Sequence, residues 1–148
     1  MLILVPAGFL VLMLLAALAV DSAVAYQDQH QLHDALAAAA NDAVAAGVDD
    51  RSFYTGGTVT LDTASVASVV CRSLEAQGLG SLHGLHVGVA LSGRSVQVTG
   101  AATVDAVFGR LVPGFGTRGI RSTADAILSG GPQPEAAAFG PPTPVACP

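Results

Sequence analysis

The sequence begins with an uncharged apolar segment, residues 2–20, and a second segment of helical character follows without an intervening Gly or Pro. Nineteen apolar residues are enough to cross the hydrocarbon core of a bilayer. Twelve of them are Leu, Ile, Val or Phe, and each favours insertion by about 0.3–0.6 kcal/mol, or about 4–7 kcal/mol in all. We therefore expect a membrane anchor, with the rest of the chain displayed on one side. The residues assigned to this anchor include Leu2, Ile3, Leu4, Phe9, Leu10, Leu14 and Leu18.

Three interpretations of this segment compete. A cleaved secretory signal is compatible with small-x-small sites that end at Ala19 and Ala25, but no basic residue precedes the apolar segment. A buried core helix would rarely be apolar on all faces over such a length in so small a protein. An uncleaved anchor fits best. Its orientation cannot be derived from charge, because no Arg or Lys precedes Arg51.

Charge and cysteine content narrow the functional classes. The 148 residues carry a net charge of −5, with six Arg and no Lys. Binding to nucleic acid is disfavoured, because phosphate recognition needs concentrated positive charge. In an extracytoplasmic chain, the two cysteines, Cys71 and Cys147, suggest one disulfide, and two unpaired thiols are the alternative.

Two helices are expected after the anchor. Residues 21–47 are rich in Ala, the best helix former, and carry an apolar stripe at helical spacing. Gly47 is a suitable stop for this helix. Asp62 is a good N-cap for a second helix over residues 63–77.

The second half of the chain alternates with a period of two residues. Residues 85–91 and 95–100 are predicted to form a hairpin, with Gly93 in its turn. Residues 104–112 have helical spacing, and residues 117–128 predict a third strand. From Gly130 onward six of the eight prolines occur without periodicity, which predicts a disordered or polyproline-like tail.

These elements predict an α+β fold. It would have a long N-terminal helix that is half in the membrane and half exposed, and a second helix. A three-stranded antiparallel sheet would follow, with a short helix before its last strand. We expect a transmembrane part over residues 1–20, an extracytoplasmic domain over residues 21–128 and a tail over residues 129–148.

The sequence contains only weak candidates for a metal or catalytic site. His30 and His33, and likewise His83 and His86, have a spacing that two zinc ligands can share, but solvated polar residues are the preferred interpretation and we predict no metal or other cofactor. No Gly-x-Ser-x-Gly elbow occurs, and no small-molecule substrate is evident, so catalysis is not predicted. Asp21, just past the apolar segment, is interpreted as a marker of the membrane boundary, with a proton relay as the less favoured alternative.

The order and spacing of the segments resemble those of a known family. The apolar helix runs into Gln31–Ala43, then Gly57–Asp62 opens a helix, a Val-rich hairpin spans Val87–Val98, and Phe108–Gly114 leads to Ile120–Ala126. This pattern, over about residues 2–128, resembles the TadE/TadG-like minor pseudopilins of tight-adherence (Flp-type) pili, in their short actinobacterial form.

The resemblance implies a single-pass protein of the bacterial cytoplasmic membrane with its domain outside, or incorporated in an extracellular filament. Its expected partners are the lipid bilayer and other pilin-like subunits or the pilus assembly platform, in pilus assembly, adherence or secretion. In such an assembly, Asp21 is the expected contact with an Arg or the N-terminus of a neighbouring subunit. The alternative is a small secreted or cell-envelope binding protein, released by signal cleavage after Ala19 or Ala25.

Overall fold

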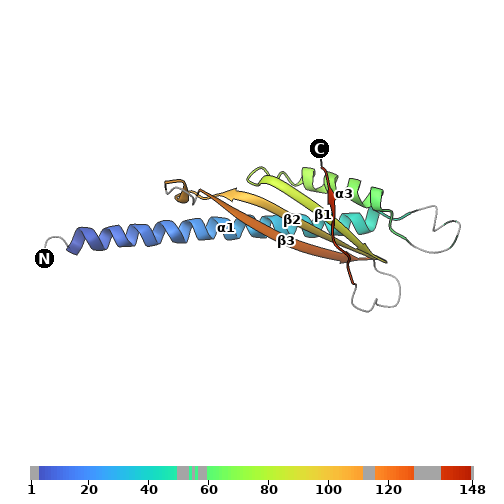
Figure 1. The fold of residues 1–148 in the computed structure, drawn as a ribbon, viewed down its shortest axis with the longest axis horizontal. Coiled ribbons are helices and arrows are strands. Elements are labelled where there is room, and N and C mark those ends of the chain that lie inside the picture. The colour runs from blue at the N-terminus through green and yellow to red at the C-terminus, as the bar shows by residue number, and fades with distance from the viewer. Residues whose placement is uncertain are drawn as a thin grey trace.

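The structure, a computed structural model, describes residues 4–49, 54, 56, 60–111, 116–128 and 138–147. A long N-terminal helix lies across one face of an antiparallel sheet, and a second helix packs beside it (Figure 1). The predicted α+β class is confirmed. Of the predicted anchor residues, Leu2 and Ile3 lie outside the described residues, and Leu4 is the first residue of the long helix.

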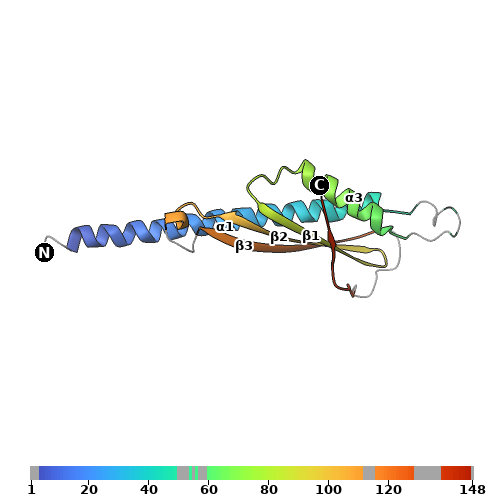
Figure 2. The same ribbon diagram turned by 45° about the horizontal axis from the view of Figure 1, so that its top comes forward.

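The long helix, α1 (Leu4–Ala46), is unbroken over 43 residues, a length of about 65 Å at 1.5 Å per residue. Its N-terminal half extends beyond the sheet in both views (Figures 1 and 2). Large apolar side chains there are exposed, for example 62% for Phe9 and 65% for Leu18. The structure therefore contradicts a buried core helix for the described part of residues 2–20. Among the described residues, α1 is the one helix long and apolar enough to cross a membrane.

Four strands form the sheet in the order β3-β2-β1-β4, and every neighbouring pair is antiparallel. The predicted β1–β2 hairpin is present, and Gly93 in its turn has a φ of +58°, which favours glycine. The strands are β1 (His83–Ser92), β2 (Ser95–Asp105), β3 (Thr117–Ile127) and β4 (Thr143–Val145).

The core lies between the sheet and the C-terminal half of α1. Leu32 and Leu36 of α1 are fully buried, as the Ala/Leu stripe predicted. A Cβ on Gly100 of β2 would stand 2.9 Å from Leu36 Cδ1, so the glycine allows the helix to approach the sheet closely. Other buried core residues are Ala39, Ala40, Ala43, Val96, Val98, Val104, Ile120 and Ala124.

The second helix, α3 (Thr63–Ala76), packs against the C-terminal half of α1 (Figure 2). The Asp62 side chain accepts a hydrogen bond from the Ser65 N–H at 2.8 Å, which confirms the predicted N-cap. Ser73 Oγ donates to Asp42 Oδ2 at 2.7 Å and so connects the two helices.

The predicted antiparallel sheet is present but has four strands rather than three, and the predicted disordered or polyproline-like tail is wrong at residues 143–145, which form the fourth strand. Thr143, Pro144 and Val145 pair with β1 at its outer edge. A proline is tolerated there because an edge strand leaves some backbone N–H groups without a partner. The pairing was not evident in the sequence, because three residues are too few to show a periodicity.

The predicted helix over residues 104–112 is also wrong at its start. β2 continues to Asp105, in register with Thr117 of β3, and the helix is reduced to a 3-10 turn, η1 (Gly109–Leu111). Val104 is buried as part of the period-two pattern of β2. Continuous pairing with β3 therefore prevails over a short stripe of helical spacing.

Candidate functional site

The end of the sheet nearest the exposed half of α1 carries the loop between β2 and β3. Its described residues are 106–111 and 116. The Ala106 N–H donates to the Gly116 carbonyl oxygen at 3.0 Å and closes the base of the loop. The loop and η1 lie beside α1, just beyond the end of β2 (Figure 1). Three consecutive backbone amides are thereby brought against the helix.

These amides surround the carboxylate of Asp21. The N–H groups of Val107 and Phe108 donate to Oδ1 at 2.8 and 2.9 Å, and that of Gly109 donates to Oδ2 at 2.8 Å. We call Asp21 and these three amides the Asp21 site. Successive N–H groups in a turn form a small anion-binding concavity, and here an anion of the same chain fills it.

The contacts hold the pKa of the Asp21 carboxyl below its ordinary value of 3.8. The hydrogen bond from the Phe108 N–H is the largest cause, partial burial acts in the opposite direction, and the N–H groups of Gly109 and Val107 add to the lowering. The positive charge of Arg118 contributes further. The carboxylate is thus charged at neutral pH, and charge-assisted hydrogen bonds hold the loop on the helix.

A groove of about 470 Å³ lies between this loop and α1. Leu14, Ala17 and Leu18 form its helix side, all within the apolar segment. Phe108 and Arg118 contribute from the loop and from β3. The groove therefore extends from the Asp21 site into the part of α1 predicted to lie in the membrane.

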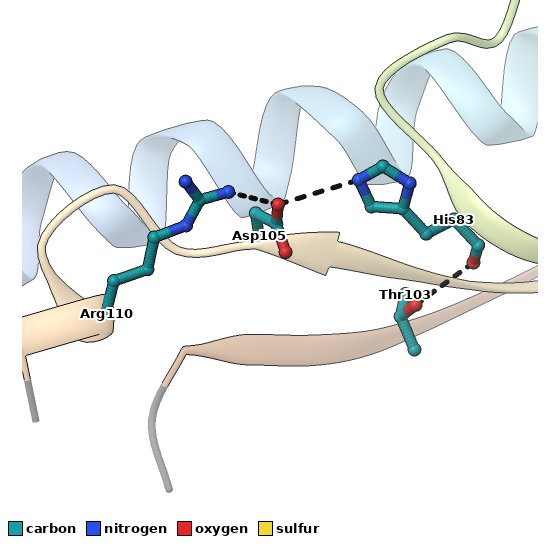
Figure 3. A network of polar contacts seen from close by, with 4 residues as sticks. All are labelled: His83, Thr103, Asp105 and Arg110. Atoms are coloured by element: carbon teal, nitrogen blue, oxygen red, sulfur yellow. Dashed lines mark hydrogen bonds and ion pairs between the residues drawn. The ribbon is translucent and has the colours of Figure 1, made fainter. Parts of the chain in front are cut away.

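A second polar network contacts the loop from the sheet side (Figure 3). Asp105, the last residue of β2, accepts a hydrogen bond from the Arg110 guanidinium, and its Oδ2 lies 3.5 Å from His83 Nε2. Thr103 Oγ1 donates to the His83 carbonyl oxygen at 3.0 Å. These side chains are partly or largely exposed, so the ion pair contributes little to stability and mainly orients the loop.

The two cysteines form a disulfide, with their Cα atoms 5.2 Å apart. Cys71 is buried on α3, and Cys147 follows β4. The bond therefore fastens the C-terminal segment to the second helix, beside the edge of the sheet where β4 pairs. This is the pairing that the cysteine count suggested.

The histidine pairs are not assembled into a ligand set. His33 Nδ1 lies 3.1 Å from Ser122 Oγ on β3, and His30 Nδ1 lies 3.8 Å from Asp34 Oδ1 on the same helix. Among the described residues, no three His, Cys, Asp or Glu side chains are placed to hold a metal ion.

The position of Asp21 directly after the apolar segment indicates that this residue has a role, but the sequence does not indicate the residues that contact it. The expected contact with a neighbouring subunit stays a prediction, since only this chain is present. The helical spacing of residues 104–112 predicts Val107 and Phe108 on the apolar face of a helix, whereas they are 55% and 43% exposed in a loop. The three donors are backbone amides, so no side-chain type in the sequence marks these residues as partners of Asp21.

No protein-family model, curated protein or solved structure matches this chain.

Proposed function

We propose that this protein is a membrane-anchored, pilin-like structural component of tight-adherence pilus assembly. The anchor holds it in the bacterial cytoplasmic membrane, and the domain acts outside the membrane through contacts with other pilin-like subunits or with the assembly platform. The proposal assigns it no catalysis.

The continuity of α1 carries the proposal. The same helix that presents exposed apolar side chains over residues 6–20 supplies the buried Leu32 and Leu36 of the domain core. A soluble monomer rarely exposes so large an apolar surface. A lipid environment, or the anchors of neighbouring subunits, would cover it.

The Asp21 site favours retention of the anchor over signal cleavage. Cleavage after Ala25 would remove Asp21 and leave three amides of the β2–β3 loop without their acceptor. Cleavage after Ala19 would spare Asp21 but would remove Leu14, Ala17 and Leu18 from the groove. Both sites lie within the unbroken helix.

Membrane retention tests the anchor. Leu12→Arg together with Leu15→Arg adds two charges near the centre of the apolar segment, each costing about 3–4 kcal/mol when the lost Leu is included. The pair should cancel the favourable insertion energy, and the protein should leave the membrane fraction after carbonate extraction. Thr123→Arg with Ile127→Arg, at exposed positions of β3 that do not line the groove, is the matched control and should remain in the membrane.

N-terminal mass and filament assays separate the candidate functions. The anchored subunit should keep its apolar segment, and deletion of its gene should reduce the filaments released by shearing, with rescue by the wild type but not by the anchor variant. A soluble product beginning at Val20 or Tyr26 would instead support the secreted binding protein. Unchanged filaments after deletion would contradict a role in pilus assembly.

A further inference from the structure

The β2–β3 loop presents apolar side chains beside the end of the anchor. Its backbone N–H groups at Val107 and Phe108 are directed to Asp21, while the two side chains remain 55% and 43% exposed. Asp21 directly follows the apolar segment 2–20. The contact therefore fixes Val107 and Phe108 at the level where the anchor would emerge from the hydrocarbon core.

The groove below the loop continues in the same direction. It reaches along α1 from Ala25 to Leu14, or about 16 Å at 1.5 Å per residue. Its lower part is lined by Leu14 and Leu18, which belong to the anchor. A groove that opens along a membrane-spanning helix is in contact with lipid acyl chains unless another protein covers it.

The charged residues around the groove are compatible with a bound phospholipid headgroup. The Asp21 carboxylate accepts three amide hydrogen bonds and lies near the positive charge of Arg118, and Asp105 pairs with Arg110 and His83, so each acid has compensating donors or positive charge beside it. Arg118 lines the same groove, and in the described part of the chain its guanidinium makes no hydrogen bond or ion pair. A guanidinium matches the geometry of a phosphate group.

We propose that Val107 and Phe108 of the β2–β3 loop are inserted among phospholipids at the bilayer surface, with Arg118 at the level of their phosphates. The Asp21 site holds the loop on the helix and so fixes the height and rotation of the domain relative to the membrane. This inference rests on the proposed membrane anchoring.

Tryptophan fluorescence can test this placement, because the chain contains no Trp. Three full-length variants would be reconstituted separately, at low protein-to-lipid ratio, in phosphatidylcholine vesicles with bromine at a shallow acyl position. Phe108→Trp reports the loop, Leu14→Trp reports the anchor, and Ile127→Trp, 50% exposed at the end of β3, is the matched control. Circular dichroism and the mass of the disulfide-bonded chain verify folding.

We expect Phe108→Trp to emit at shorter wavelength than Ile127→Trp and to be quenched at least twofold more strongly. Adding Asp21→Ala should remove at least half of that difference, because the loop is released from the helix. Strong quenching of Leu14→Trp with Phe108→Trp at the level of the control would overturn the inference and leave the anchor intact. If Leu14→Trp is also weakly quenched, the result would overturn both the placement of the loop and the proposed membrane anchor.

A second copy of the chain is the competing occupant of this surface. A blue-shifted Phe108→Trp that brominated lipid does not quench, and whose shift disappears as the protein is diluted in lipid, would assign the loop to a contact between copies. That result would also overturn the inference.

Discussion

Removal of the Cys71–Cys147 disulfide should destabilise the domain much less than its loop length suggests. The bond closes a loop with a sequence separation of 76. If the native state were unchanged by reduction, the loss of chain entropy in the denatured state would correspond to about 4.5 kcal/mol at 25 °C. That value is an upper limit, because reduction also frees part of the native chain.

The freed part is the segment after β3. Nineteen positions separate Leu128 from Cys147, and β4 contributes three paired residues, of which Pro144 has no N–H to donate. We expect β4 to leave β1 when the bond is reduced. The loss of unfolding free energy is then a difference between two entropic costs of loop closure. One is for a loop of 76 positions in the denatured state and the other for a loop of nineteen in the native state, and they differ by about 1.2 kcal/mol.

Calorimetry of the full chain in detergent measures this loss. The oxidised protein should unfold about 5 °C above the reduced protein. A Cys71→Ala, Cys147→Ala double variant should behave as the reduced protein does and be insensitive to reductant. Hydrogen exchange supplies an independent readout, since the β1 amides that face β4 should lose protection on reduction while those that face β2 keep it.

The loss of stability on reduction differs clearly between a native state that releases β4, about 1.2 kcal/mol, and one that keeps it, about 4.5 kcal/mol. A loss above about 3 kcal/mol with β1 still protected on its β4 side would refute this reasoning, because it requires β4 to remain paired without the bond. No change in protection together with no change in stability would refute it as well.

Three further predictions concern other parts of the molecule. Gly47→Ala should lower the free energy of unfolding, measured by urea titration, by about 1–3 kcal/mol, because the added Cβ would lie 2.4 Å from the Ala43 carbonyl oxygen. Gly119→Ala is the control and should leave that free energy nearly unchanged, because a Cβ there would meet open space. Leu36→Ala should cost about 2–5 kcal/mol in the same assay, because Leu36 is fully buried; a loss below 1 kcal/mol would contradict its central place in the core. Because the pKa of Asp21 is lowered in the folded state, its contribution to stability is complete above pH 3.8 and is lost as the pH falls through the folded-state pKa. Hydrogen exchange of the Val107, Phe108 and Gly109 amides should therefore accelerate in that acidic range in the wild type, but show no such pH dependence in Asp21→Asn.

Patterns that span many residues predicted the fold. The Ala/Leu stripe of residues 32–44 identified the buried face of α1, and the alternation in residues 95–100 identified the buried face of β2. Each pattern is repeated several times within one element, so single exceptions such as Gly100 do not obscure it. The N-cap at Asp62 was predictable for a different reason, since its hydrogen bond reaches only three residues along the chain.

Features that depend on a few long-range contacts were not predicted. β4 consists of three residues, and its partner β1 lies more than fifty positions earlier in the chain. The Asp21 site joins residues 86 to 88 positions apart through backbone amides, which carry no side-chain signature. A carboxylate bound by amides can contact any sequence that supplies the right turn, so the sequence indicated the acid and not its partner.

The Asp21 site lies at the point along α1 where the surroundings of the helix change. Above Asp21 the sheet and α3 cover α1, and below it the helix is exposed apolar surface. A loop held by side-chain packing alone would need an apolar partner on the helix, and such a partner would be equally suited to lipid. A charged group that accepts three backbone hydrogen bonds fixes the loop without that ambiguity, and it leaves the apolar side chains of Val107 and Phe108 free to contact the surroundings of the anchor.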